Sequence, residues 1–260
     1  MKLFPYTSTL SAMVGVSLAS AAHATVVFDA SPMNTTVTTN NGPPTGLTGT
    51  PGALTLTGAT DNFNSTGIAS TFDINTLNGT NLVATDTVTI RLTVDSITGG
   101  PIRSNGINFG IRDAASFVPV NALGTGNNLI GLEAGNNESD ILSFVDSNAV
   151  VDTGFSATDA EILNGFSLTL TADVNGWEYT LESVGATSPL TVEGAYSGTE
   201  FVDTFGGGHF FYTAQKFNNA DPLVSNISEA SIHVTSIPEP SAFALLGLGS
   251  LGLLLRRRRA

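Results

Sequence analysis

Few side chains in this chain of 260 residues are suited to acid–base or metal chemistry. There are three histidines, His23, His209 and His233, and no cysteine. The absence of cysteine excludes disulfides, thiolate metal sites and cysteine nucleophiles. His23 lies in a segment that is predicted below to be removed, and two histidines without cysteine are too few for a catalytic zinc site. No Gly-x-Ser-x-Gly sequence occurs, so a serine hydrolase has no support.

Paired carboxylates remain as a route to catalysis, because glycosidases need two of them at a fixed separation. Glu138, Ser139 and Asp140 begin the Glu-x-Asp-x-Glu pattern of concanavalin-like glycosidases. The third carboxylate position of that pattern holds Leu142 or Ser143, so the acid–base partner is missing. We therefore expect no catalytic residue and no enzyme activity, with a degenerate or unrecognised glycosidase as an alternative.

Two acid-rich segments, residues 133–140 and 146–148, offer oxygen ligands of the kind that calcium prefers. Because their spacing matches no defined calcium loop, solvated turns on an acidic surface explain these segments better. We expect no cofactor and assign no metal ligand, with a structural calcium ion as the alternative.

Aromatic side chains are the other groups that could hold a sugar. Trp177, Tyr179, Tyr196 and Tyr212 could stack on sugar rings, yet each also fits a core-facing strand position. For Trp177 we expect a place in the core.

The charge balance narrows the choice of partners. Nine basic residues stand against 22 acidic ones, for a net charge of −13. Between residues 25 and 237 only Arg91, Arg103, Arg112 and Lys216 are basic. Because binding to phosphate needs a basic face, nucleic acid is excluded as a partner.

The N-terminal residues 1–24 have the pattern of a secretory signal peptide. Lys2 supplies the positive start, an apolar stretch runs from Leu10 to Ala19, and Ala22-His23-Ala24 gives a small-x-small cleavage site. The apolar stretch is too short to span a bilayer. We expect cleavage at Ala22 and Ala24 by the secretion machinery, with the mature chain beginning at Thr25.

The C-terminal residues 238–260 contain three features in order: Pro238, Glu239 and Pro240, then an apolar helix over residues 241–255, then the basic cluster Arg256, Arg257, Arg258 and Arg259. The predicted helix reaches about 22 Å, which is short of a hydrocarbon core of about 30 Å. The arginines stay cytoplasmic, so everything before Pro238 lies outside the inner membrane.

This tail resembles the PEP-CTERM sorting signal of exosortase substrates. The resemblance covers residues 238–260 and implies an exosortase-type processing enzyme as partner and transient anchoring in the inner membrane. It also implies a final place at the cell envelope, the outer surface or an exopolysaccharide (biofilm) matrix. An ordinary single-pass tail anchor is the alternative.

Between these ends, residues 25–237 show the alternation of antiparallel strands. Val88, Ile90, Leu92 and Val94 point to one face while the residues between them are polar. The same pattern occurs at 107–111 and at 230–234, where His233 points outward. We predict about a dozen short strands in an all-β antiparallel sandwich of jelly-roll type, with one short helical turn at 157–163. Residues 31–52 are predicted to form an irregular loop or an ordered edge.

The clearest hairpin is predicted to join the strands 166–173 and 177–182 through Val174-Asn175-Gly176. This hairpin and the segment Phe205-Gly-Gly-Gly-His209-Phe-Phe-Tyr212 make the body similar to concanavalin A-like lectin sandwiches. In that segment His209 is expected at a flexible position or turn. The whole pattern predicts an exported, non-catalytic protein of the surface or matrix, with a carbohydrate-binding lectin-like module as the alternative.

Overall fold

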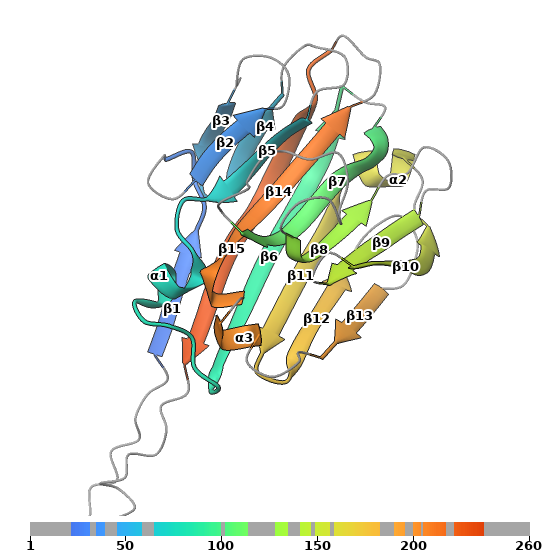
Figure 1. The fold of residues 1–260 in the computed structure, drawn as a ribbon. Helices are drawn as coiled ribbons and strands as arrows, with labels where there is room; N and C mark the ends of the chain where they lie inside the picture. The colour runs from blue at the N-terminus through green and yellow to red at the C-terminus, as the bar shows by residue number, and fades with distance from the viewer. Residues whose placement is uncertain are drawn as a thin grey trace, which may run out of the picture. The chain divides into compact units, whose positions relative to one another are not determined.

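The computed structural model describes residues 22–31, 35–39, 46–58, 65–99, 102–113, 128–134, 141–146, 149–156, 159–182, 190–195, 200–203, 205–216 and 221–236. Residues His23–Ser236 form one compact unit. It consists mainly of two antiparallel sheets that lie face to face (Figure 1). The predicted antiparallel β-sandwich is therefore confirmed.

Within the described residues, the first sheet has eight strands, in the order β13-β12-β11-β6-β15-β4-β3, and β1 pairs with β15 beside this path. Its strands are β1 (Ala22–Val27), β3 (Gly46–Thr50), β4 (Ala53–Thr57), β6 (Asp86–Thr98), β11 (Phe166–Asp173), β12 (Gly176–Leu181), β13 (Leu190–Gly194) and β15 (Val224–Ser236).

The second sheet has seven strands, in the order β10-β9-β8-β7-β14-β5-β2. They are β2 (Thr35–Thr39), β5 (Ser65–Ser70), β7 (Ile102–Asp113), β8 (Asn128–Ala134), β9 (Ile141–Asp146), β10 (Ala149–Ser156) and β14 (Gly208–Lys216).

The core lies between the two sheets. In β6 the predicted alternation holds, since Val88, Ile90, Leu92 and Val94 are all buried. The second sheet contributes apolar side chains from β7 and β14 to the same core. Two tyrosines join the sheets: Tyr179 of β12 donates to the carbonyl oxygen of Phe109 at 3.1 Å, and the hydroxyl of Tyr212 in β14 lies 2.9 Å from that of Ser225 in β15.

The predicted hairpin is present, with a shorter turn. Asp173 pairs with Gly176, so the loop is only Val174 and Asn175, and Gly176 belongs to β12. The carboxylate of Asp173 accepts a hydrogen bond from the backbone N–H of Asn175 at 2.7 Å, which closes an Asx-turn. Gly176 is required for a close approach, because a Cβ at this position would overlap the carbonyl oxygen of Gly194.

The edges and helices complete the fold. Within the segment 31–52, the structure has two edge strands, β2 and β3, which favours the ordered edge over the loop. The expected helical turn is α2 (Asp159–Leu163). The described residues also form two short helices that the sequence pattern does not predict, α1 (Ile74–Asn78) and α3 (Glu200–Asp203). A 3₁₀ turn, η2 (Phe205–Gly207), precedes β14.

Candidate functional site

Polar residues are buried on the side of β7 that faces away from the core. Ile107, Phe109 and Ile111 point into the core, so Asn108 and Arg112, which alternate with them, lie on the opposite face. Asn108 is 1% exposed and Arg112 is 0% exposed.

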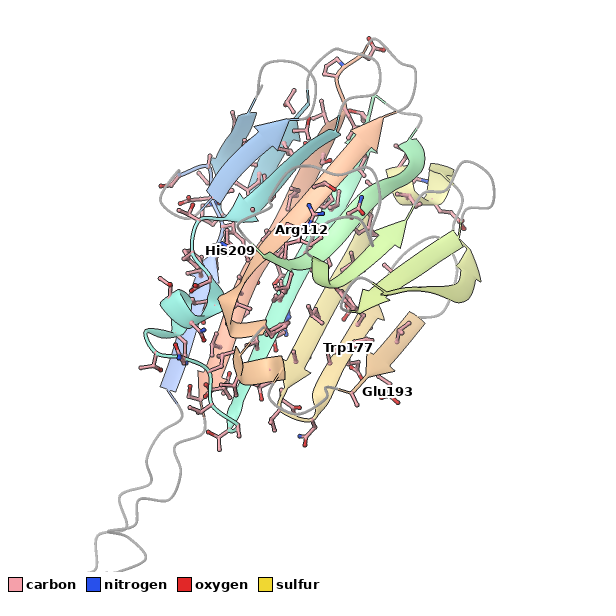
Figure 2. The ribbon with its side chains drawn as sticks, viewed as in Figure 1. Arg112, Trp177, Glu193 and His209 are labelled. Atoms are coloured by element: carbon pink, nitrogen blue, oxygen red, sulfur yellow. The ribbon has the colours of Figure 1, made fainter. Side chains whose placement is uncertain are left out.

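The strand beside β7 supplies the neighbours of Arg112. His209 of β14 is its register partner, and the Arg112 guanidinium lies 4.8 Å from the ring centre of Phe211, a cation–π contact. Figure 2 shows Arg112 and His209 close together on these adjoining strands. Burial disfavours the charged guanidinium and lowers the pKa of Arg112 to about 10.

His209 has a structural role in this cluster. It lies in β14, and its Nδ1 donates to the carbonyl oxygen of Ser70 in β5 at 3.0 Å. The Ser70 hydroxyl in turn accepts from the backbone N–H of Phe210 at 3.1 Å. The expectation of a flexible position or turn for His209 is therefore wrong, because pairing with Arg112 of β7 holds this residue in a strand.

A buried cation over an aromatic ring is suited to recognising a carboxylate or a sugar hydroxyl. In this structure, however, Arg112 has no exposed surface. What the geometry supports is a packed polar layer that fixes β7 against β14 and β5.

An open groove lies on the eight-stranded sheet, beside the β11–β12 hairpin and β13. Its volume is about 590 Å³, and three of the residues that line it are the carboxylates Asp173, Glu178 and Glu193. Glu178 and Glu193 are direct register partners on β12 and β13, and both are exposed. Opposed like charges weaken strand pairing slightly, so this position favours cations or hydrogen-bond donors near the groove.

Trp177 lines the floor of this groove but is almost wholly buried. It is 4% exposed, and its ring packs directly against the Cα of Gly194, its register partner on β13. Figure 2 shows Trp177 and Glu193 on these neighbouring strands. The prediction that Trp177 belongs to the core is confirmed. Tyr179 and Tyr212 are also buried, whereas Tyr196 lies outside the described residues.

Several predicted residues lie outside the part of the chain that the structure describes. Glu138, Asp140 and the calcium candidates at 135–140 and 147–148 lie outside the described residues, and so do the sorting motif and the arginine cluster. Both residues of the predicted cleavage site, Ala22 and Ala24, fall in β1. Within the described ranges, no group of three or more histidine, aspartate or glutamate residues could hold a metal ion. No helix in the same part of the chain is long and apolar enough to cross a membrane.

The comparison with protein families identifies the tail. Residues 236–259 match the family model of the PEP-CTERM protein-sorting motif, which confirms the resemblance drawn from the sequence. The match supports export and sorting by an exosortase to the cell envelope. No curated protein sequence matches the chain.

The solved structures identify the fold of the body as that of the legume lectins. Peanut lectin, with a 9-residue peptide, has a TM-score of 0.56 at 13% identity, over 85% of this chain and 100% of the lectin. Arcelin-5, a lectin-like defence protein from Phaseolus vulgaris, has a TM-score of 0.56 at 11% identity, over 82% of this chain and 99% of that protein. Winged bean acidic lectin, in complex with methyl-α-D-galactose, has a TM-score of 0.53 at 12% identity, over 85% of this chain and 100% of the lectin. At these identities the likeness concerns the fold alone.

Proposed function

We propose that this chain is a non-catalytic protein of the outer surface or extracellular matrix, delivered by its N-terminal signal and sorted and processed through residues 238–260. The observation that carries the proposal is the match of residues 236–259 to the PEP-CTERM sorting motif, directly after the last strand of a folded body. Association with exopolysaccharide in a biofilm is the setting that the tail implies.

The sorting step has a direct test in the producing cell. Replacing Pro238, Glu239 and Pro240 by alanine is expected to leave export intact and to leave full-length protein in the inner membrane. Because proline disfavours helix at the residue before it, the two prolines would keep the junction extended, as a peptidase cleft requires, whereas alanines would allow a helix to continue through it.

The matched control is Thr235→Ala, which lies one residue before the segment that matches the sorting motif. This variant is expected to be sorted normally. Normal sorting of the triple-alanine variant would contradict the proposal.

Carbohydrate binding is the second candidate function, and the lectin fold favours it. The body covers the full length of a lectin whose structure contains methyl-α-D-galactose. The proposed contact surface is the groove beside the β11–β12 hairpin, where Asp173, Glu178 and Glu193 offer acceptors for sugar hydroxyls.

A glycan array that includes α-galactosides, run with calcium and with a chelator, tests this candidate. We expect binding that is lost in a Glu178→Gln, Glu193→Gln double variant. Glu182→Gln is the control, because Glu182 is an exposed glutamate that does not line the groove. Absence of binding to every glycan in both conditions would remove the lectin function and leave the sorting proposal standing.

A further inference from the structure

The predicted signal cleavage site lies inside a strand of the folded body. β1 runs from Ala22 to Val27, so a cut after Ala24 would remove the first half of this strand. If residues 22–24 contribute to the fold, a cut after Ala24 would damage the folded body.

The contacts of β1 define its pairing with β15. The backbone N–H of Phe28 donates to the carbonyl oxygen of Ala230 at 2.9 Å, and the Thr25 hydroxyl lies 3.2 Å from Nδ1 of His233. Residue numbers therefore rise along β1 as they fall along β15, so the two strands are antiparallel. The same register continues to Ala24 opposite Val234 and to His23 opposite Thr235, one residue before the end of β15.

The residues upstream of Thr25 belong to this ladder. In an antiparallel pair, hydrogen-bonded and non-bonded residue pairs alternate. The bonded pair Phe28–Ala230 therefore implies two further bonded pairs, Val26–Ile232 and Ala24–Val234. Ala24 and Val26 also pack against the core, and Phe28 is buried with its ring 4.8 Å from that of Phe210. A cut after Ala24 would remove the bonded pair at Val234 and place a charged amine at Thr25, in the middle of the strand.

The sequence contains a second Ala-x-Ala triplet three residues earlier, Ala19-Ser20-Ala21. It meets the same requirement of the signal peptidase for small residues. We propose that the signal is cut after Ala21, so that the mature chain begins at Ala22 and keeps the whole of β1. This inference rests on the proposed export of the protein.

The inferred cut places the first residues of the mature chain beside the last residues of β15. A chain that begins at Ala22 starts with β1, whose first residues pair with the last residues of β15, just before the sorting motif at Pro238. Both ends of the mature body then lie on one pair of strands at one end of the eight-stranded sheet (Figure 1).

The test is the N-terminal residue of the exported wild-type protein, read by mass spectrometry of its terminal peptide. We expect Ala22, and an exported protein that begins at Thr25 or at any other residue would overturn the inference. Protein that keeps Met1 and stays in the cytoplasm would instead contradict export, so the two failures are distinguishable.

Two matched substitutions locate the cut independently. Leucine is too large for the residue before the cut. Ala21→Leu is expected to block processing after residue 21, whereas Ala24→Leu is expected to be cut normally and to begin at Ala22. Processing is measured on total cell extract, so poor folding of a variant does not obscure the result. The opposite pattern, with Ala24→Leu blocked and Ala21→Leu cut, would overturn the inference.

Discussion

Gly194 of β13 has the indole ring of Trp177 packed directly against it. A methyl group at this position would overlap the ring, which is itself held in the core. We expect Gly194→Ala to lower the free energy of unfolding by about 1–3 kcal/mol, the usual cost of forcing extra volume into a packed core. Thermal unfolding of the folded body measures this as a fall in Tm of roughly 2–4 °C per kcal/mol.

Gly207→Ala is the control for this substitution. Gly207 is exposed in η2, and a Cβ there would meet nothing within 4 Å. An unchanged Tm for Gly194→Ala, or an equal loss in both variants, would contradict the packing of Trp177 under β13.

Tyr212 makes the stability of the body sensitive to alkali. Its burial raises the pKa of the phenol far above the usual value of about 10. The folded state therefore keeps a proton that the unfolded state loses above about pH 10, so this group stabilises the fold at neutral pH and progressively less as the pH rises. We expect Tyr212→Phe to lose less stability than wild type between pH 9 and 11, as denaturant titrations at each pH would show.

Ser225→Ala is the matched variant for Tyr212→Phe. Both lose the hydrogen bond between the two hydroxyls, at a cost of about 1 kcal/mol, but only Ser225→Ala keeps the titrating phenol. Arg112, whose lowered pKa acts in the opposite direction at high pH, is common to all three proteins. Equal pH slopes in the two variants would contradict the role of Tyr212.

For single residues, the sequence predicts apolar core positions better than buried polar positions. Alternation correctly places Val88, Ile90 and Trp177 inside. It also places Arg112 and Asn108 on the face away from the core, where a strand pattern predicts solvent. Their burial depends on the segments that cover that face in the folded protein. The alternation within β7 does not predict those segments.

The β11–β12 hairpin depends on a side-chain hydrogen bond in its turn. Asp173 accepts from the backbone N–H of Asn175, and the loop has only two residues. We expect Asp173→Ala to lower the free energy of unfolding by about 1 kcal/mol, whereas Asp173→Asn keeps the acceptor oxygen and most of the stability. Chemical denaturation of both variants measures the difference. Equal losses would show that charge, and not the turn geometry, is the cause.

Strong two-faced strands such as β6 and β11 are predictable because one face of each must be apolar. The exact register of the hairpin is less predictable. Asn175-Gly176 indicates a turn, but the loop is only Val174 and Asn175, because Gly176 already pairs with Asp173. The edge strands β2 and β3 are rich in threonine and glycine, so their partners β5 and β4 define them more than their own pattern does.

The molecule as a whole combines a lectin-like sandwich with a sorting tail. The body folds without disulfides, through a continuous core between its sheets. Its excess of acidic residues favours solubility outside the cell and repulsion from other acidic polymers. The match of residues 236–259 to the sorting motif agrees with the sequence prediction, because the order of the three tail features is itself the signal.

In the proposed function the tail is a processing signal and not a permanent anchor. The intact mass of wild-type protein extracted from the cell surface tests it most directly. We predict a mature chain that lacks residues 241–260, since the exosortase would cut near Pro238-Glu239-Pro240. A surface species that still contains Arg256 to Arg259 would contradict the claim and support a plain tail anchor.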